Sequence, residues 1–336
     1  MENRPLFPNA VFETLTAYRR TAALRGAIEL DLFTAVGEGN ETLAALAPRC
    51  QASERGVRML CDFMVVLGFL AKQDQRYSLT PSAAAFLDRR SPTYMGTLSG
   101  FLNSPMISSG FADVAAAVRK GGTVIDREGT VGPEHPVWVE FARSMEPRAA
   151  LSAELLFDLL DLDPTRAWKV LDIAAGHGRF GIALAQRCPR TTVIALDWPN
   201  VLTVAEENAR AAGVADRFDT LPGDAFSTEL GDGYDLVLLM NFLHHFDTDS
   251  CEQLLRQIHA ALAADGRAII LDFVPNEDRV SPPPAAMFAL AMLATTPSGD
   301  AYTFSDYDRM LRGAGFRQSD LHQLVPSPQQ VVVAWK

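Results

Sequence analysis

The sequence predicts an α/β protein in which a Rossmann-like, seven-stranded and mostly parallel sheet follows a mainly helical N-terminal domain. Three observations support this fold class. From Trp168 onward, apolar strand patterns alternate with helical patterns, which is typical of a parallel sheet covered by helices. The first of these strands runs into Gly176-x-Gly178-x-x-Gly181 and then into a helix, as in nucleotide-binding α/β folds. Before Trp168, apolar residues recur at three- and four-residue spacing, which predicts helices.

The length and composition of the chain limit its class. The chain has 336 residues, enough for two domains, and its 48% hydrophobic residues support well-packed cores. The formal net charge of −11 argues against a general nucleic-acid binder, which usually has a basic face. The four cysteines are scattered without the spacing of a metal site. We therefore expect buried free thiols, as in a reducing compartment.

The sequence predicts no membrane segment. Its longest uncharged stretch, residues 280–299, is interrupted by four prolines, which do not suit a membrane-spanning helix. The first ten residues lack the apolar core of a signal peptide. We therefore expect a cytoplasmic protein without membrane contact.

The first domain is predicted over residues 1–92. Residues 41–47 and 53–67 have helical patterns, with Ser53 as N-cap of the second helix, and residues 69–79 form two short strand patterns around a polar turn. Helix, helix and a two-stranded wing is the layout of a winged helix, whose obvious use is DNA binding. The helix in the recognition position has balanced charge and an apolar second half. These features favour a core or a subunit interface over DNA contact.

The rest of the chain is predicted to form a helical linker, residues 93–160, and the sheet domain, residues 161–336. Within the linker, helices are expected at residues 93–119 and 136–160, with a loop at residues 121–129. Strands are predicted at residues 169–173, 192–196, 218–221, 234–240, 267–273, 318–324 and 330–334. No helical pattern separates the last two strands, so we expect an antiparallel hairpin at one edge of the sheet.

A ligand site is predicted where the strands end, since ligands of open α/β sheets bind beyond the carboxyl ends of the strands. Gly176 and Gly178 follow the first strand, and a side chain at either would block a nucleotide-like ligand. Asp172 lies inside this strand, where dinucleotide-binding folds more often have an apolar residue. An acid there suits a ligand with an amine or a sulfonium. His177, within the loop, is expected to point to solvent.

Acidic residues follow the next two strands. Asp197 lies about 20 residues beyond the glycines, the spacing of a carboxylate that accepts hydrogen bonds from both ribose hydroxyls of an adenosine-containing cofactor. Asp224, after the third strand, suits an adenine amino group, with the ring of Phe226 packed on the base. A turn or a helix cap is the alternative interpretation of Asp224.

The fourth strand ends at Met240 and leads to two adjacent histidines, His244 and His245. No further His or Cys lies at ligand spacing, so no metal site is predicted. One histidine facing a pocket has a suitable pKa for a general base, and the other would then be structural. Asp272, at the end of the fifth strand, suits the acceptor of a hydrogen bond that fixes the tautomer of this imidazole.

Taken in order, these motifs resemble the O-methyltransferases that join a winged-helix dimerisation domain to a class I S-adenosylmethionine (SAM)-dependent fold. Acetylserotonin, caffeic acid and polyketide-tailoring O-methyltransferases belong to this group. The resemblance covers residues 12–336, and it implies SAM as cofactor, a homodimer, a place in secondary metabolism, His244 as catalytic base and Asp272 as its supporting acid. SAM contacts are expected from Asp172, Gly176, Gly178, Asp197, Trp198, Asp224, Ala225, Phe226, Met240 and Asn241. The acceptor pocket is expected to include Phe141, Met145, His245, Met287, Phe288, Met292, Leu293 and Thr296.

Two positions depart from the family pattern. Phe246 replaces the tryptophan of a Leu-His-Asp-Trp-like motif around the base, and Ala301 stands where the family has a second supporting glutamate. The resemblance implies methyl transfer from SAM to a small aromatic or polyketide-like acceptor, at a hydroxyl oxygen. Because a carbon acid or an amine needs less help from a paired base, Ala301 keeps C- or N-methylation on the same scaffold open.

Three other classes also remain open from the sequence. One is a SAM-binding relative that catalyses another reaction, such as an elimination or a rearrangement. Another is a SAM-responsive DNA-binding regulator that uses the winged helix, against which the nearly neutral first hundred residues argue. The third is an NAD-dependent dehydrogenase, for which an antiparallel hairpin at the end of the sheet is not typical.

Overall fold

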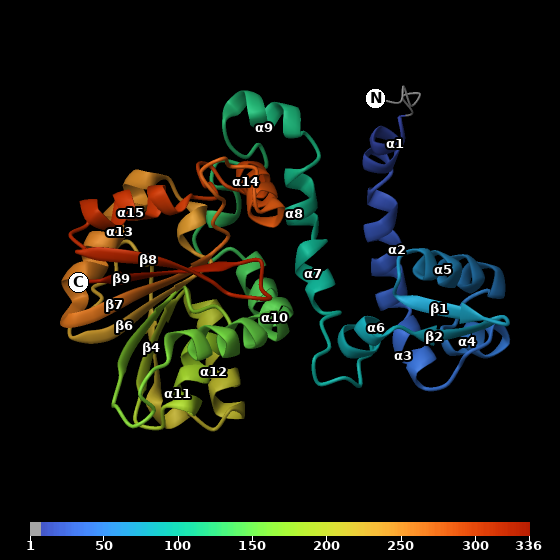
Figure 1. The fold of residues 1–336 in the computed structure, drawn as a ribbon, viewed down its shortest axis with the longest axis horizontal. Helices are drawn as coiled ribbons and strands as arrows, with labels where there is room; N and C mark the ends of the chain where they lie inside the picture. Colours follow the sequence, from blue (N-terminus) through green and yellow to red (C-terminus); the bar gives the residue numbers. More distant parts are fainter. Residues whose placement is uncertain (1–7) are drawn as a thin grey trace, which may run out of the picture. The chain divides into compact units, whose positions relative to one another are not determined.

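The computed structural model describes residues 8–336 (Figure 1). The prediction about a signal peptide concerns mainly the first seven residues, which lie outside the described residues. The chain divides into two compact units, the first ending at Ser99 and the second beginning at Gly100. The predicted domain boundaries after residues 92 and 160 stay predictions.

The first unit combines short helices with a two-stranded sheet. Its helices are α1 (Asn9–Leu15), α2 (Tyr18–Glu29), α3 (Leu32–Gly37), α4 (Leu43–Arg49), α5 (Glu54–Val66) and α6 (Pro81–Phe86). The strands β1 (Leu70–Gln73) and β2 (Arg76–Leu79) pair antiparallel and form the wing. The predicted order of helix, helix and wing is therefore confirmed.

Helix α5 forms where the sequence predicts it. The hydroxyl of Ser53 accepts a hydrogen bond of 3.2 Å from the backbone N–H of Gly56 and caps the helix. Val57, Cys61 and Met64 follow at helical spacing and are buried in the core of this unit. The apolar half of α5 thus has a place in the core of its own unit.

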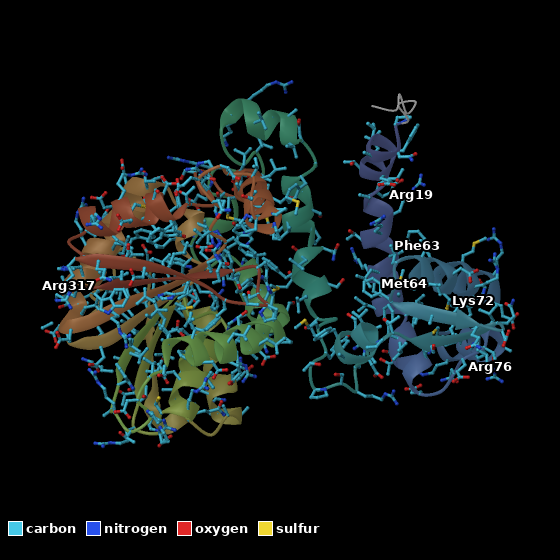
Figure 2. All side chains as sticks on the ribbon, in the orientation of Figure 1. Arg19, Phe63, Met64, Lys72, Arg76 and Arg317 are labelled. Carbon is cyan, nitrogen blue, oxygen red and sulfur yellow. The ribbon has the colours of Figure 1, made fainter. Side chains whose placement is uncertain are left out.

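Basic side chains of the wing form ion pairs with acidic residues. Lys72 Nζ lies 2.7 Å from a carboxylate oxygen of Asp62, and Arg76 Nη1 lies 2.9 Å from one of Glu41 (both cations are labelled in Figure 2). DNA affinity comes mainly from cations that neutralise phosphates. Since these two cations already have acidic partners, the wing favours a core or interface role over DNA contact.

The second unit is built on a seven-stranded sheet. Its strands are β3 (Lys169–Ile173), β4 (Thr192–Asp197), β5 (Phe218–Pro222), β6 (Tyr234–Met240), β7 (Leu262–Asp272), β8 (Gln318–Gln323) and β9 (Gln330–Trp335). They are arranged in the order β5-β4-β3-β6-β7-β9-β8. Strands β3 to β7 are parallel, whereas β9 is antiparallel to both β7 and β8. All seven predicted strands and the antiparallel hairpin at one edge are confirmed.

The helices of this unit precede the sheet or cover its two faces (Figure 1). They are α8 (Pro105–Gly110), α9 (Val114–Lys120), α10 (Val137–Leu160), α11 (Arg179–Arg187), α12 (Pro199–Ala211), α13 (Thr248–Ala261), α14 (Pro283–Thr295) and α15 (Phe304–Gly313). Helix α7 (Leu98–Leu102) contains the unit boundary, and three short 3-10 helices are η1 (Gly129–Val131), η2 (Ala215–Arg217) and η3 (Leu243–His245). The single pattern predicted at residues 93–119 is therefore three short helices.

Neighbouring strand residues point to opposite faces of the sheet. Val170 packs in one core with Leu156 of α10 and Ile182 of α11, whereas Leu171 packs in another with Leu255 of α13 and Met310 of α15. Because both faces are covered, the central strands β3 and β6 are buried along nearly their whole length and are mostly apolar, whereas the edge strand β8 is mostly polar. This burial fixes the strands, and their carboxyl ends position the side chains described next.

Two further predictions concern the chain as a whole. All four cysteines are buried and free, as expected. Among residues 8–336, no helix is long and apolar enough to cross a membrane. The cytoplasmic location stays a prediction.

Candidate functional site

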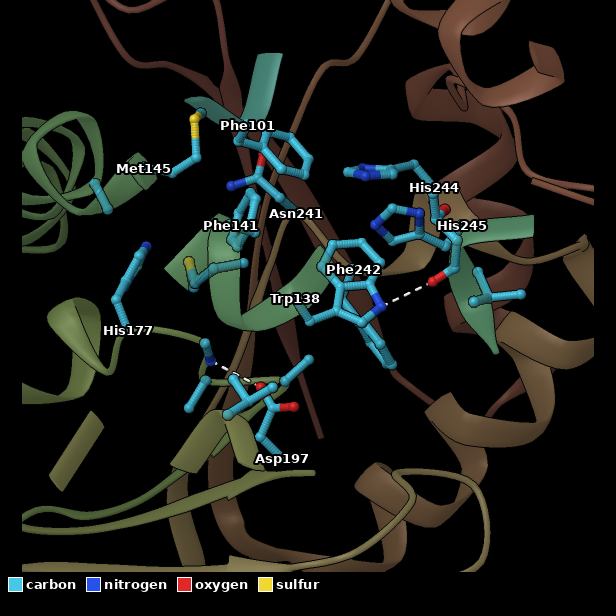
Figure 3. Close-up of a pocket in the computed structure, with 18 of the residues that line it drawn as sticks. Phe101, Trp138, Phe141, Met145, His177, Asp197, Asn241, Phe242, His244 and His245 are labelled. Atoms are coloured by element: carbon cyan, nitrogen blue, oxygen red, sulfur yellow. Dashed lines mark hydrogen bonds between the residues drawn. The ribbon is translucent and has the colours of Figure 1, made fainter. Parts of the chain in front are cut away.

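A cavity of about 290 Å³ lies at the carboxyl ends of β3 to β7 (Figure 3). Fourteen of the residues expected to bind the cofactor, act in catalysis or form the acceptor pocket line it, namely Phe141, Met145, Gly176, Asp197, Trp198, Asp224, Ala225, Phe226, Met240, Asn241, His244, His245, Phe288 and Met292. The sheet explains why residues so distant in sequence meet. Parallel strands end on the same side, so the loops that follow them form one wall.

Gly176 begins the part of the cavity formed by β3 and β4. Its φ is +57°, and its N–H donates a 2.8 Å hydrogen bond to Oδ2 of Asp197. A Cβ at this position would make only ordinary contacts, with the ring of Phe141 at 3.7 Å and the carbonyl oxygen of Ala174 at 3.9 Å. The backbone therefore leaves open space toward the cavity, which suits close approach of a ligand.

Asp197, at the end of β4, is nearly fully buried. Its Oδ1 also accepts a 2.7 Å hydrogen bond from the N–H of Trp198. Burial raises the pKa of the Asp197 carboxyl to about 6, although both backbone N–H groups oppose the shift. Each carboxylate oxygen has two lone pairs, so Asp197 retains acceptor capacity that faces the cavity.

Asp224 stabilises a turn and also lines the cavity. Its side chain accepts hydrogen bonds from the N–H of Phe226 at 3.1 Å and from the hydroxyl of Ser227 at 3.2 Å, so it stabilises the turn after β5. It also lines the cavity, together with Phe226.

Two residues expected to contact the cofactor, Asp172 and Gly178, do not line the cavity. Oδ2 of Asp172 instead accepts a 3.2 Å hydrogen bond from the N–H of Gly181 in the first turn of α11. At Gly178, with φ of +70°, a Cβ would lie 3.0 Å from the ring of Phe218 and 3.1 Å from Ala205 Cβ. These two residues hold the loop against the helices, and the expectation of direct ligand contact is corrected.

His177 does not point to solvent, and that expectation was wrong. The side chain is buried, lines the cavity and stacks on Phe141 with 6.1 Å between ring centroids. Its Nδ1 accepts a hydrogen bond from the N–H of Arg179, and burial lowers the pKa of the imidazole to about 3. The glycine turn folds this residue beneath α10, which the loop sequence alone does not reveal.

An aromatic wall completes this side of the cavity. Phe141 packs edge-on against Phe101 and Trp138, with centroid distances of 5.1 and 5.7 Å. Trp138 donates a 2.8 Å hydrogen bond from its indole nitrogen to the carbonyl of Thr130 (Figure 3). The sequence analysis missed Phe101 and Trp138, although aromatic residues on the predicted linker helices were a usable signal.

His244 and Asp272 form the chemical centre of the other side. Nδ1 of His244 lies 2.7 Å from Oδ1 of Asp272, and both side chains are buried. Oδ1 also accepts from the N–H of Phe273, while Oδ2 accepts a 2.9 Å hydrogen bond from the hydroxyl of Tyr307. The expected link between these two residues is therefore present, and Tyr307 is a partner that the sequence analysis missed.

Both adjacent histidines point into the cavity (Figure 3). They can do so because they lie on η3 and not on a strand, and their rings are 4.3 Å apart. His245, expected in the acceptor pocket, lines the cavity beside His244. Burial lowers the pKa of His245 well below its usual value, and its Nδ1 is buried without a hydrogen-bond partner in the described residues.

The loop that carries Ala301 passes directly beneath His244. The N–H of Asp300 donates a 3.0 Å hydrogen bond to the backbone carbonyl of His244, and Ala301 is buried. No carboxylate extends from position 301, so the acid that supports His244 comes from Asp272, which Tyr307 holds in turn.

Helix α14 contributes one face to the cavity. Phe288, Ala291, Met292 and Thr295 line it at helical spacing. Three residues expected in this pocket lie outside it: Met287, Leu293 and Thr296. Met287 is 68% exposed and belongs to another face of the helix. Thr296 is the C-cap residue beyond the helix, and its hydroxyl donates to the carbonyl of Met292.

Comparison with known proteins identifies the family. Residues 112–317 match the family model of the O-methyltransferase domain, and residues 12–89 match that of the O-methyltransferase dimerisation domain. The 3-hydroxy-5-methyl-1-naphthoate 3-O-methyltransferase of Streptomyces sahachiroi is 29% identical over 313 residues, which cover 92% of this chain and 89% of that protein.

Solved structures agree with the fold. A Nostoc punctiforme structure assigned as an O-methyltransferase superposes with a TM-score of 0.94 at 53% identity and covers 99% of this chain and 100% of its own. Human N-acetylserotonin methyltransferase in complex with SAM superposes with a TM-score of 0.86 at 21% identity, covering 100% and 99% of the two chains, and supports the fold alone. The chain therefore belongs to the family of SAM-dependent O-methyltransferases and carries both the methyltransferase domain and the dimerisation domain of that family.

Proposed function

We propose that this enzyme methylates a hydroxyl oxygen of a small aromatic or polyketide-like acceptor, with His244 as the general base. The observation that carries the proposal is the buried contact of His244 with Asp272, in the wall of a cavity that also contains Gly176 and Asp197. Catalysis by positioning requires a methyl donor and a base in one enclosed space.

The residues at the ends of β3, β4 and β5 fit SAM. Gly176 leaves room for the ligand, and Asp197 has spare lone pairs for the ribose hydroxyls. Asp224 and Phe226 suit the adenine amino group and ring. SAM supplies an electrophilic methyl group on a positively charged sulfur, a charge that the aromatic face of Phe141 favours.

The chemistry of the base follows from its hydrogen bonds. A phenol has a pKa near 10, so only about one in a thousand molecules is ionised at pH 7. With Nδ1 of His244 bound to Asp272, Nε2 takes the hydroxyl proton as the acceptor oxygen attacks. Asp272 stabilises the imidazolium that results. General-base catalysis of this kind is worth roughly 10²–10⁴ in rate.

The acceptor pocket suits a flat, largely apolar molecule. Met145, Phe288 and Met292 provide adaptable and aromatic contacts around His244. The acceptor named for the Streptomyces sahachiroi relative, a hydroxylated naphthoate, is a molecule of this shape. We carry this class of acceptor over to the present chain.

C- or N-methylation is the second candidate. Ala301 replaces the glutamate that would assist the base, and a carbon acid or an amine needs less assistance than a phenol. Uptake of labelled methyl from SAM across matched phenols, carbon acids and amines separates the candidates. O-methylation requires a stable label on the phenols, whereas a label on carbon or nitrogen alone contradicts it.

The cofactor site is tested by calorimetric titration with S-adenosylhomocysteine (SAH) and, separately, with NAD. We expect micromolar binding of SAH alone, and loss of this binding in Asp197→Ala. Binding of NAD in place of SAH, or unchanged SAH affinity in the variant, would overturn the assignment. Tight SAH binding without methyl transfer to any acceptor would leave the other reactions of SAM-binding relatives.

We also propose that the domain boundaries lie after residues 92 and 160. A further proposal is that the chain forms a homodimer. Within the first unit, α1 exposes Phe12 and Leu15 by 59% and 68%, and Tyr18 follows at 66%, so apolar surface remains for a second copy. Light scattering should give about twice the 36.6 kDa of one chain. A mass near that of a single chain would contradict the dimer.

A further inference from the structure

One cation of the cavity wall has no counterion. Arg148, on α10, is partly buried and lines the cavity. In the described part of the chain it forms no ion pair or hydrogen bond. Its neighbours on the same helix differ, because Arg143 lies 3.0 Å from Glu207 and Glu146 is paired with Arg179.

The surroundings of Arg148 are aromatic. Its guanidinium carbon lies 5.4 Å from the centroid of the Phe273 ring, which stacks on Phe288 at 4.3 Å. Phe288 in turn packs edge-on against His244 at 4.7 Å. Arg148 therefore belongs to the same end of the cavity as the proposed base.

The acids of the cavity lie elsewhere. Among the described residues, Asp197 and Asp224 are the carboxylates in the lining, and they follow β4 and β5. Phe273, whose ring contacts Arg148, follows β7. In the sheet, β3 and β6 lie between β7 and the strands β4 and β5. Neither acid forms an ion pair with Arg148, and both belong to the end proposed for adenosine.

A partly buried guanidinium costs free energy unless an anion compensates it. Burial lowers the pKa of Arg148, and no carboxylate opposes this shift. The group still carries its charge at neutral pH, because a guanidinium stays protonated in proteins. A contact with an aromatic face stabilises a cation but does not neutralise it. An anion bound in the cavity would supply the compensation that the described residues do not.

We infer that Arg148 binds a carboxylate of the acceptor, so that the preferred acceptors are hydroxylated aromatic acids. The inference rests on the proposed function and names its substrate class. A guanidinium presents paired N–H donors that match a carboxylate in two parallel hydrogen bonds. Arg148 and His244, on either side of the stacked pair Phe273 and Phe288, would hold the acid and the reacting hydroxyl of one flat molecule.

The methionine part of SAM also carries a carboxylate, and the test has to separate the two sources. The probes are a hydroxynaphthoic acid and its primary amide, a neutral molecule of nearly the same shape. Their affinities for the SAH-bound enzyme and their rates of methyl uptake are measured, together with SAH affinity alone. The variants are Arg148→Met and, as a matched control on the same helix, Arg143→Met.

We expect the wild-type enzyme and Arg143→Met to bind and methylate the acid at least tenfold better than the amide. Loss of a charge-assisted pair typically costs a factor of roughly ten to a hundred. Arg148→Met should lose this preference while SAH affinity and the amide rate stay unchanged. A wild-type enzyme without preference for the acid overturns the inference. So does an Arg148→Met variant that keeps the preference but loses SAH affinity, which would assign the arginine to the cofactor carboxylate.

The binding measurement tests this inference independently of the proposed reaction. Preferential binding of the acid that Arg148→Met abolishes, without methyl transfer, supports the arginine site and contradicts O-methylation. Equal methylation of acid and amide supports O-methylation and contradicts the arginine site.

Discussion

Nδ1 of His244 and Oδ1 of Asp272 are 2.7 Å apart in a site where both side chains are buried. The contact leaves Nε2 as the ring nitrogen that is available to an acceptor. It also sets the tautomer, since the Nδ1–H donates a hydrogen bond to the carboxylate and the free lone pair then lies on Nε2. Because Asp272 supports His244, replacing His244 and replacing His245 should have different effects on methyl transfer.

His244→Ala should lower methyl transfer at least a hundredfold and leave SAH affinity little changed, because it removes the base without altering the residues proposed for the cofactor. Steady-state kinetics with labelled SAM and SAH titration provide the measurement. His245→Ala is the control, because burial holds the pKa of His245 low and no acid contacts its ring. A hundredfold loss in His245→Ala, with His244→Ala still active, would mean that His245 and not His244 is the base.

Tyr307→Phe should act through Asp272. The hydroxyl of Tyr307 donates to Oδ2 of Asp272 at 2.9 Å. Without this donor, Asp272 is held less firmly against Nδ1 of His244, so kcat in steady-state kinetics should fall while SAH affinity stays unchanged. Loss of a buried hydrogen bond should also reduce the free energy of unfolding by about 1–3 kcal/mol.

The control for this prediction is Tyr302→Phe. Tyr302 is buried next to Tyr307, but its hydroxyl donates to the carbonyl of Phe246 and not to Asp272. It should lower stability without lowering kcat. An equal kcat for the wild type and Tyr307→Phe would limit Tyr307 to a structural role.

The sheet and one side of the site could be predicted from the sequence for the same reason. Parallel strands buried on both faces are apolar runs, and polar residues at their carboxyl ends must meet at one edge. Asp197 and Asp272 were found in this way, as was the contact of Asp272 with one of the two histidines, which the family resemblance identified as His244. These residues are close to one another because each follows the carboxyl end of a parallel strand, and these ends lie at the same edge of the sheet.

The rest of the site lies on helices and turns, where the sequence pattern gives a face but not a partner. Tyr307 and Arg148 belong to helices whose approach to the cavity depends on packing in three dimensions. Met287 and Phe288 are adjacent apolar residues, and only the packing of α14 decides that the second lines the cavity. His177 was misjudged because a loop residue that α10 covers has no distinct periodicity.

Asp172→Asn should change the pH dependence of stability. Burial raises the pKa of Asp172 to about 7, whereas in the unfolded chain a carboxyl group titrates near 4. Between these values the folded state binds the extra proton, so this group makes the wild type less stable as the pH rises from about 4 to about 7. Above that range the full penalty persists, on the order of a few kcal/mol.

Asparagine cannot ionise, yet its carbonyl can still accept the N–H of Gly181. The melting temperature of Asp172→Asn minus that of the wild type should therefore rise between pH 4 and pH 7 and then stay constant. The difference between the two proteins cancels the titration of all other groups. A difference that does not vary with pH would mean that Asp172 titrates as an ordinary carboxyl group.

Gly176→Ala and Gly178→Ala should separate ligand space from packing space. Both glycines have positive φ, so alanine at either position costs roughly 1–2 kcal/mol. At Gly178 the new methyl group would also press on the ring of Phe218 at 3.0 Å and on Ala205 at 3.1 Å. At Gly176 it would make only ordinary contacts, with the ring of Phe141 at 3.7 Å and the carbonyl oxygen of Ala174 at 3.9 Å.

Thermal unfolding without ligand should therefore show a larger loss for Gly178→Ala than for Gly176→Ala. SAH titration should give the opposite order, with at least a tenfold loss for Gly176→Ala, because its methyl group would occupy space that the ligand needs. Gly178→Ala, where it remains folded, should bind SAH with nearly normal affinity, since its methyl group points into the contact between α12 and β5. Normal SAH binding by Gly176→Ala would mean that the cofactor does not approach this turn, and the open side of the loop would then need another occupant.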